Sequence, residues 1–340
     1  MSDPRRRRVL VVGGVLMGLG LASLVVGLGI GSTGFTSVFS LRDDPVALQI
    51  VRDIRLPRTL GAWLAGALLG LSGAVAQGLF RNPLADPYLL GSASGALLGV
   101  AFALLLFGGD AAGASVGAQW ALRLGLTGAA FVGATAAVLL TLALARGVQQ
   151  TLRLLLAGVI VGVVLGATKD LVTLQQADIL VALTGFMLGN TGLVGWSACA
   201  TMAGCALVCV VAGRVLAPVL DGLALGEATA ASLGLPLPAM RAALVAVLAL
   251  ATGAAVAQTG LIAFVGLAAP HLVRSVVKTT HAGLIVLSAA MGGLLLMAAD
   301  LLARWLIAPQ ELPVGVLTAL LGGGYLLWLM RGGTLRGGAR

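Results

Sequence analysis

The chain has 340 residues, of which 59% are hydrophobic and only 10% are charged, and its formal net charge is +9. A soluble domain usually has about a quarter of its residues charged, so this composition excludes an ordinary soluble protein. Aromatic residues make up 4% of the chain, too few for base-stacking surfaces, so the positive charge does not indicate a nucleic-acid partner. Apolar runs of about 18 residues or more recur, each long enough to cross a bilayer. The sequence predicts an all-α polytopic membrane protein.

The first apolar run, 9–30, follows the basic cluster Arg5–Arg8. A basic start before an apolar run also occurs in secretory signals. This run is longer than the usual core of a signal peptide, so we expect a retained first span that starts in the cytoplasm.

Ten spans are expected in a single permease domain, 1–340. After the first span they lie at about 57–80, 90–107, 121–145, 153–172, 192–212, 240–258, 261–277, 283–303 and 313–330. The more polar stretches 31–54, 108–119 and 173–190 are placed outside, and the long loop 213–240 is placed inside.

The distribution of basic residues sets the orientation. With both termini in the cytoplasm, fourteen of the 21 basic residues lie on the inner side: Arg5, Arg6, Arg7, Arg8, Arg81, Arg146, Arg153, Arg214, Arg241, Arg274, Lys278, Arg331, Arg336 and Arg340. This bias follows the positive-inside rule. The cluster of Arg52, Arg55 and Arg58 on the outer side is an exception and needs a separate explanation.

A short internal repeat suggests two related halves. Ala74–Gln77 and Ala255–Gln258 both read Ala-Val-Ala-Gln, and the two predicted spans that contain them run in opposite directions. Inverted repeats are common in transporters, although a four-residue match in an Ala- and Val-rich chain is weak evidence by itself.

Four stretches resemble the permease subunits of type II ATP-binding cassette (ABC) importers, the FecCD family. They are 55–95, which begins R-L-P-R-T-L-G and contains R-N-P-L-A-D-P, 260–274 with A-A-P-H-L-V-R, 299–304 with A-D-L-L-A-R, and 311–315 with E-L-P-V-G. The resemblance covers most of the chain from about residue 50 to residue 330.

The resemblance implies a fold and a set of partners. We expect a permease homodimer in the bacterial inner membrane, two ATPase subunits that bind ATP and Mg, and a periplasmic binding protein. The implied substrates are ferric siderophores, haem or cobalamin. The chain itself is expected to carry no cofactor, no metal site and no catalytic residue, so it is not expected to be an enzyme.

The resemblance also implies residue roles at the outer side. Arg55, Arg58 and Arg304 match family arginines that meet acidic residues of the binding protein. Opposed charges steer encounter and fix orientation, and arginine suits paired contacts with carboxylates. The alternative is that these side chains reach toward lipid phosphates at the interface.

On the inner side the resemblance implies a gate and a coupling loop. Asn82 and Leu84 match positions that constrict the pathway, and Thr151 and Leu152 match a second constriction more loosely. Gly226, Glu227 and Gly234, in the loop 213–240, match the segment that couples to the ATPase. An ordinary Asn-Pro turn and a surface amphipathic helix are the simpler interpretations of the two segments.

Several other polar residues favour structural roles. Asp300 with Glu311, and Lys169 with Asp170, lie near outer span ends, where ion pairing within the chain is the simpler interpretation. His271 is expected to be a hydrogen-bonded packing residue, and the alternatives are a proton relay or a haem ligand. Cys199, Cys205 and Cys209 share one apolar segment and are expected to be small packing residues, with no convergent ligands for a metal.

Two other function classes have less support. A secondary transporter driven by an ion gradient would need a carboxylate at mid-membrane or an ion site at a broken helix, and the scarcity of acidic residues inside the spans argues against it. A membrane scaffold or enzyme leaves the outer arginines and the coupling-like loop unexplained. The sequence contains no G-x-x-x-x-G-K-[ST] motif, so ATP hydrolysis is expected in a separate subunit.

Overall fold

The computed structural model describes residues 4–31, 34–35, 45–107, 116–145, 151–174, 176–232, 234 and 236–334. The α-helices are α1 (Pro4–Gly29), α2 (Pro45–Ile50), α3 (Leu56–Leu79), α4 (Ser92–Phe107), α5 (Val116–Leu144), α6 (Thr151–Leu174), α7 (Ala177–Leu188), α8 (Trp196–Ala224), α9 (Glu227–Ser232), α10 (Leu237–Thr259), α11 (Val265–Val276), α12 (His281–Trp305) and α13 (Val314–Thr334). A π-helical turn, η2 (Val51–Arg55), leads into α3, and a 3₁₀ turn, η3 (Pro87–Leu90), precedes α4. Two short antiparallel strands, β1 (Ile30–Gly31) and β2 (Gly34–Phe35), follow α1.

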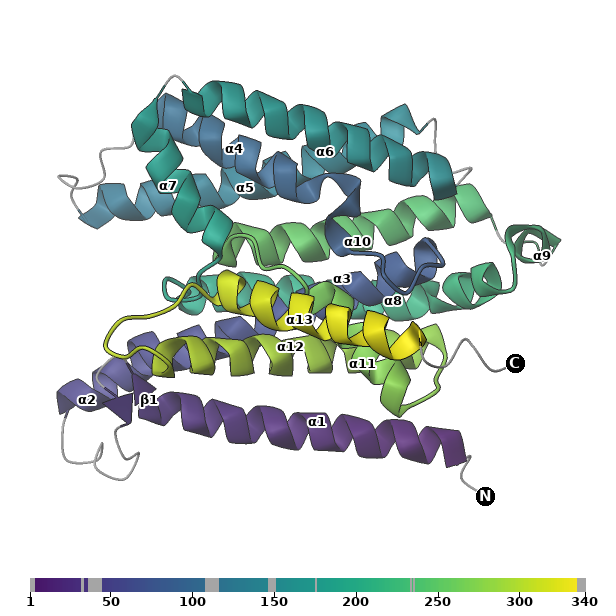
Figure 1. Ribbon diagram of the computed structural model, residues 1–340, viewed down its shortest axis with the longest axis horizontal. Helices are drawn as coiled ribbons and strands as arrows, with labels where there is room; N and C mark the ends of the chain where they lie inside the picture. The colour runs from purple at the N-terminus through teal and green to yellow at the C-terminus, as the bar shows by residue number, and fades with distance from the viewer. Residues whose placement is uncertain are drawn as a thin grey trace.

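The long helices lie side by side along the longest axis of the molecule (Figure 1). The start of α1, the short helix α9 and the end of α13 lie at one end of the bundle, which we call the α9 end. Helices α2 and α7 and strand β1 lie at the opposite end, which we call the α2 end. The orientation predicted from the basic residues places the α9 end in the cytoplasm.

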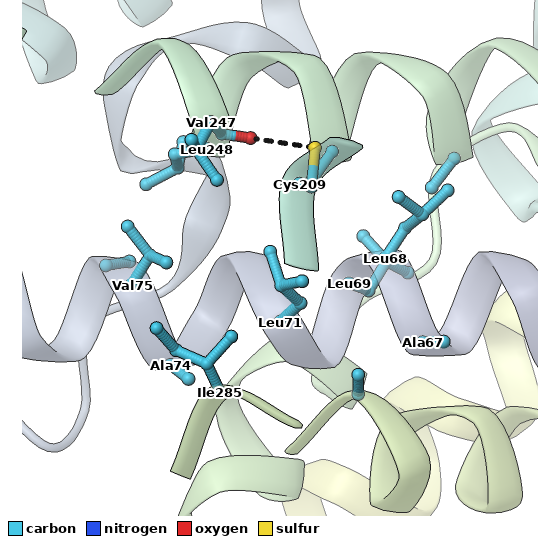
Figure 2. Packing of buried hydrophobic residues seen from close by; sticks show 14 of the residues in the cluster. Ala67, Leu68, Leu69, Leu71, Ala74, Val75, Cys209, Val247, Leu248 and Ile285 are labelled. Atoms are coloured by element: carbon cyan, nitrogen blue, oxygen red, sulfur yellow. Dashed lines mark hydrogen bonds between the residues drawn. The ribbon is translucent and has the colours of Figure 1, made fainter. Parts of the chain in front are cut away.

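Helix α3 forms the centre of the bundle. Nearly all of its residues are buried, and it packs on α8, α10, α11 and α12. Figure 2 shows Leu71 of α3 between Cys209 of α8 and Val247 and Leu248 of α10 on one side, and Ile285 of α12 on the other. Cys209 Sγ lies 3.7 Å from the carbonyl oxygen of Val247, so this cysteine is a small packing residue, as the sequence predicted.

Glycines allow α3 and α12 to approach closely. A Cβ atom on Gly66 would overlap the carbonyl of Gly292, and one on Gly70 would overlap the carbonyl of Ser288. Small residues let helix backbones approach closely in this way. In lipid the hydrophobic effect contributes little to helix association, so close van der Waals packing of this kind is a main source of stability.

We therefore expect Gly70→Ala to destabilise the protein by about 1–3 kcal/mol, the usual cost of an overpacked site. The measurement is thermal unfolding of the purified chain in detergent. Gly18→Ala on α1 is the matched control, because a Cβ there meets nothing within 4 Å. Equal unfolding midpoints for the two variants would contradict this account of the crossing.

Helix lengths agree with most of the predicted spans. Within the described residues, seven helices are long and apolar enough to cross a membrane, and the shorter apolar helices α4, α7 and α13 bring the number of apolar helices to ten. The ten apolar helices of the structure do not all coincide with the ten predicted spans. The stretch 173–190, placed outside as a polar connection, contains α7, whose sequence I-L-V-A-L-T-G-F-M-L is apolar.

Two further predicted boundaries were wrong. The predicted span 261–277 is an irregular segment followed by the 12-residue α11, which at about 1.5 Å per residue is too short to cross a bilayer. The loop predicted from residue 213 begins later, because α8 continues to Ala224 despite Pro218.

The two copies of the internal repeat lie at similar places in two helices. Ala74–Gln77 and Ala255–Gln258 lie near the ends of α3 and α10, which run in opposite directions (Figure 1). Each helix is followed by an irregular segment with a non-glycine residue at positive φ, Arg81 at 49° and Phe264 at 68°. Such conformations are uncommon for non-glycine residues. The two related halves stay a prediction.

Candidate functional site

At the α2 end, four charged side chains form a cluster inside the bundle. Arg58 of α3 donates from Nη1 to both carboxylate oxygens of Glu311, at 3.0 and 2.8 Å, and from Nη2 to Oδ1 of Asp300 on α12 at 3.2 Å. Arg304, one turn after Asp300, donates from Nη2 to its Oδ2. Two positive and two negative charges balance here, as the burial of charge requires.

Two threonines complete this charged cluster. Thr191, in the connection between α7 and α8, donates to Oδ1 of Asp300 at 2.5 Å. Thr59 accepts from Nη2 of Arg304 at 3.2 Å. Asp300 is 0% exposed and Arg304 is 1% exposed, so the cluster ties α3, α12 and two connections together in a water-poor site.

The ion pair predicted near Asp300 and Glu311 is therefore present, with Arg58 as the shared partner. The second predicted pair, Lys169 with Asp170 near the end of α6, is also present, at 2.5 Å. The sequence did not indicate Thr191, because a single threonine in a polar connection has no distinguishing pattern.

Arg55 binds to the end of α1. Its Nη1 donates to the carbonyl of Leu28 at 3.0 Å and to that of Gly29 at 3.5 Å. The last carbonyls of a helix lack partners within the helix and carry its negative dipole end, so an arginine there is stabilising.

These contacts bear on the docking role predicted for the three arginines. Arg58 and Arg304 are buried and occupied within the chain, and Arg55 is half-buried. Contact of the Arg304 guanidinium with a binding protein would require the charged cluster to open. The docking role of all three residues stays a prediction.

At the α9 end, the connection 80–91 interrupts the helical path between α3 and α4, and we call this connection the break. Arg81 takes a positive φ, and Asn82, Pro83 and Leu84 are exposed. The side chain of Asn82 accepts from the backbone nitrogen of Leu84 at 2.9 Å, which holds the turn in shape. Asp86 accepts from the nitrogen of Tyr88 at 2.8 Å and caps η3. The predicted gate residues Asn82 and Leu84 thus lie on an ordered, exposed turn.

The break packs against α6. A Cβ atom on Gly158 would overlap the carbonyl of Leu89, and Gly91, with φ of 80°, lies against Gly162. Thr151 is the first residue of α6 and Leu152, 69% exposed, is the second. Both predicted gate segments therefore belong to the same end of the bundle.

The predicted coupling segment contains the short helix α9 between two glycines. Gly226 has φ of 112° and Gly234 has φ of 75°, so both need the conformational freedom of glycine. The carboxylate of Glu227, the first residue of α9, forms an ion pair with Nη2 of Arg241 on α10 at 2.8 Å and lies 3.8 Å from Nη2 of Arg81. One carboxylate thus links α9 to α10 and to the break that carries the gate residues.

A second polar link joins the end of α3 to α11. Gln77 donates to the carbonyl of Leu267 at 3.1 Å, and Nη1 of Arg274 donates to Oε1 of Gln77. Sequence reasoning missed this link, although an amide inside an apolar span was a usable signal. His271 contacts the ring of Tyr325 edge-on, with ring centroids 5.8 Å apart, as a packing residue would.

Comparisons with known proteins agree over most of the chain. The FecCD transport family matches residues 15–332. The hemin transport system permease protein HmuU of Yersinia pestis is 37% identical over 318 residues, which cover 93% of this chain and 92% of that protein. The vitamin B12 import system permease protein BtuC of Salmonella typhimurium is 41% identical over 281 residues, 82% of this chain and 83% of that protein.

A solved structure agrees with the fold. An inward-facing conformation assigned to a metal-chelate type ABC transporter superimposes with a TM-score of 0.83 at 27% sequence identity. The match covers 94% of this chain and 98% of that chain.

Proposed function

The chain belongs to the FecCD transport family, and we propose that it carries a metal chelate from the periplasm to the cytoplasm across the bacterial inner membrane. It is a membrane-spanning permease subunit of an ABC importer and not an enzyme. The similarity to the hemin and vitamin B12 permeases over most of the chain carries this proposal. The termini and α9 would face the cytoplasm, in keeping with the basic residues at that end.

We propose that two copies form the pathway, with one ATPase subunit bound to each α9 and one periplasmic binding protein at the α2 end. ATP and Mg would bind to the ATPase subunits. Exposed apolar side chains on α6, including Leu156, Ile160 and Val163, leave a broad surface for lipid or for the second copy. ATP-bound and ATP-free states of the partner would favour different gate positions, because only such differential binding can shift an equilibrium.

The contacts of Glu227 support a route for coupling. A movement imposed on α9 by the ATPase would act on Glu227, then on Arg81 and the turn with Asn82 and Leu84, because the carboxylate lies between them. The gate role of Thr151 and Leu152 is proposed on the weaker ground that the start of α6 lies at the same end of the bundle.

At the α2 end, we propose that the charged cluster holds the docking surface in shape. Arg58 keeps Glu311, whose side chain is 32% exposed, beside the buried Asp300. Arg55 would contribute to docking from the end of α1, and Arg58 and Arg304 would contribute when the cluster opens.

A tryptophan at position 84 tests the gate. Leu84 is 55% exposed on the turn, so Leu84→Trp is expected to lower uptake by about tenfold while leaving the fold intact, since a bulky gate side chain obstructs passage. The measurement is ATP-driven uptake in proteoliposomes. The control is Val11→Trp, at a 58% exposed position on the outer surface of α1. Unchanged uptake and unchanged basal ATPase rate in Leu84→Trp would remove Leu84 from the gate.

The experiment that tests the function as a whole is reconstitution with the cognate ATPase and binding protein. Labelled hemin, cobalamin and a ferric siderophore are offered with and without ATP inside the vesicles. We expect ATP-dependent uptake of one of them. Uptake that ignores ATP and follows an ion gradient would favour a secondary transporter instead.

A further inference from the structure

A basic cavity lies at the α9 end, away from the gate and from α9 itself. Its volume is about 1130 Å³, and it is bounded by the start of α1, by α8, by the end of α11 and by the connection from α11 to α12. Four basic residues line it: Arg8, Arg214, Arg274 and Lys278. Asp221 is the single acidic residue in its lining.

The charges in this cavity do not cancel. Asp221 already accepts from the backbone nitrogen of His281 at 3.1 Å, and its Oδ1 lies 2.6 Å from Nδ1 of the same histidine. Arg8, Arg214 and Lys278 are exposed, and within the described part of the chain no carboxylate lies at ion-pair distance from them. The cavity therefore has a surplus of positive charge with hydrogen-bond donors free for an anion.

The lining is also partly apolar. Leu10, 68% exposed, and Val276, 63% exposed, flank the basic side chains. Helix α1 is exposed along most of its length and lies at the edge of the bundle (Figure 1), so the cavity is next to the expected lipid. A small soluble anion would gain nothing from these apolar side chains, whereas a phospholipid would contact both the basic and the apolar side chains.

We propose that this cavity binds the headgroup of an anionic phospholipid of the inner leaflet. The phosphate would accept from Arg8, Arg214 and Lys278, as charge-assisted hydrogen bonds allow. The first acyl carbons would lie against Leu10 and Val276. Basic pockets between membrane helices on the cytoplasmic side are suited to such headgroups. The inference rests on the orientation proposed above.

The bound lipid would also affect the centre of the bundle. Arg274 lines the cavity and donates to Gln77 at the end of α3, which in turn donates to the carbonyl of Leu267. An anion beside Arg274 would hold this guanidinium in place and so order the residues just before the break at Arg81.

The test is native mass spectrometry of the purified chain in detergent, offered equal amounts of palmitoyl-oleoyl phosphatidylglycerol and palmitoyl-oleoyl phosphatidylcholine. These lipids differ only in their headgroups. We expect retained phosphatidylglycerol to exceed phosphatidylcholine by at least about fivefold, in line with the attraction of one basic side chain for an anionic lipid surface. The triple variant R8Q/R214Q/K278Q should lose this preference. The triple variant R7Q/R52Q/R153Q, with the same charge change at exposed positions outside the cavity, should keep it.

The proposal would be overturned if R8Q/R214Q/K278Q kept the preference for phosphatidylglycerol, or if both triple variants lost it equally. Displacement of phosphatidylglycerol by millimolar inorganic phosphate would also overturn it, because it would indicate a site for free phosphate. If the cavity variant retains the lipid but no longer binds the ATPase subunit, the basic residues belong to that interface. If the triple variant does not fold, K278Q alone is measured against R153Q. The assay needs no transport, so its failure and the failure of the proposed function are distinguishable.

Discussion

Replacing Asp300 with asparagine is expected to destabilise the protein by about 3–5 kcal/mol, the usual cost of removing one partner from a buried ion pair. The side chain of Asp300 is 0% exposed and bonds to Arg58, Arg304 and Thr191 at once. Without its charge, two guanidinium groups remain inside the bundle with only the partly exposed carboxylate of Glu311 between them. The measurement is thermal unfolding in detergent, together with the yield of folded protein from the membrane.

The control is Asp170→Asn, which breaks the ion pair with Lys169. The carboxylate of Asp170 is 66% exposed, so its loss should cost less than about 1 kcal/mol. If D300N does not yield folded protein, the double variant D300N/R304M removes one charge of each sign and should recover part of the yield. Equal unfolding midpoints for D300N and D170N would show that the charged cluster contributes no more than the pair of Lys169 and Asp170.

Glu227→Gln is expected to reduce ATP-driven uptake by about tenfold or more, while the chain still folds. Arg241, whose side chain is 3% exposed, and Arg81 both lose their carboxylate partner. Because Glu227 is 36% exposed and water can replace part of the interaction, the stability cost should be only about 1–2 kcal/mol. The loss of uptake would be larger than this loss of stability explains, because the link between α9 and the gate turn is lost.

Three readouts separate coupling from stability: the unfolding midpoint, the affinity for the ATPase subunit, and the number of substrates carried per ATP hydrolysed. Asp178→Asn, which changes an exposed acidic residue on α7 at the other end of the bundle, is the matched control. A loss of uptake that tracks the unfolding midpoint alone, with the ratio of transport to hydrolysis unchanged, would assign Glu227 a purely structural role.

The charged cluster at the α2 end also relates stability to docking. Asp300, Glu311 and the three arginines lie where the binding protein is proposed to dock, and all but Arg55 are bonded to one another. A binding protein with acidic side chains would compete with Asp300 and Glu311 for the same guanidinium groups. Docking would then weaken contacts between α3 and α12, and the binding protein would in this way affect the packing of the central helix.

The sequence by itself determined the class of protein and most of its helices. Apolar runs such as 57–80 and 283–303 can only be helices in a bilayer, because lipid offers no partner for free backbone groups. Gly226 and Gly234, which the family resemblance placed in the coupling segment, flank α9 at positive φ, a conformation that few other residues accept. The motifs near Arg55 and Asp300 indicated the family.

Only the tertiary structure decided which polar groups meet. Arg58 and Asp300 are 242 positions apart, and they are partners because glycines on α3 and α12 let these helices cross closely. The family resemblance assigned Arg58 and Arg304 to an external partner, which stays a prediction. Their contacts with Asp300 and Glu311 inside the chain were not predictable, because position along a span does not show the direction of a side chain. Sequence reasoning also missed α7, which packs on α4, α6 and α13, and the irregular segment before α11. A buried charge in a membrane protein must have a partner of opposite charge. Which partner it has depends on contacts between residues that are distant in the chain, and these contacts exist only in the folded structure.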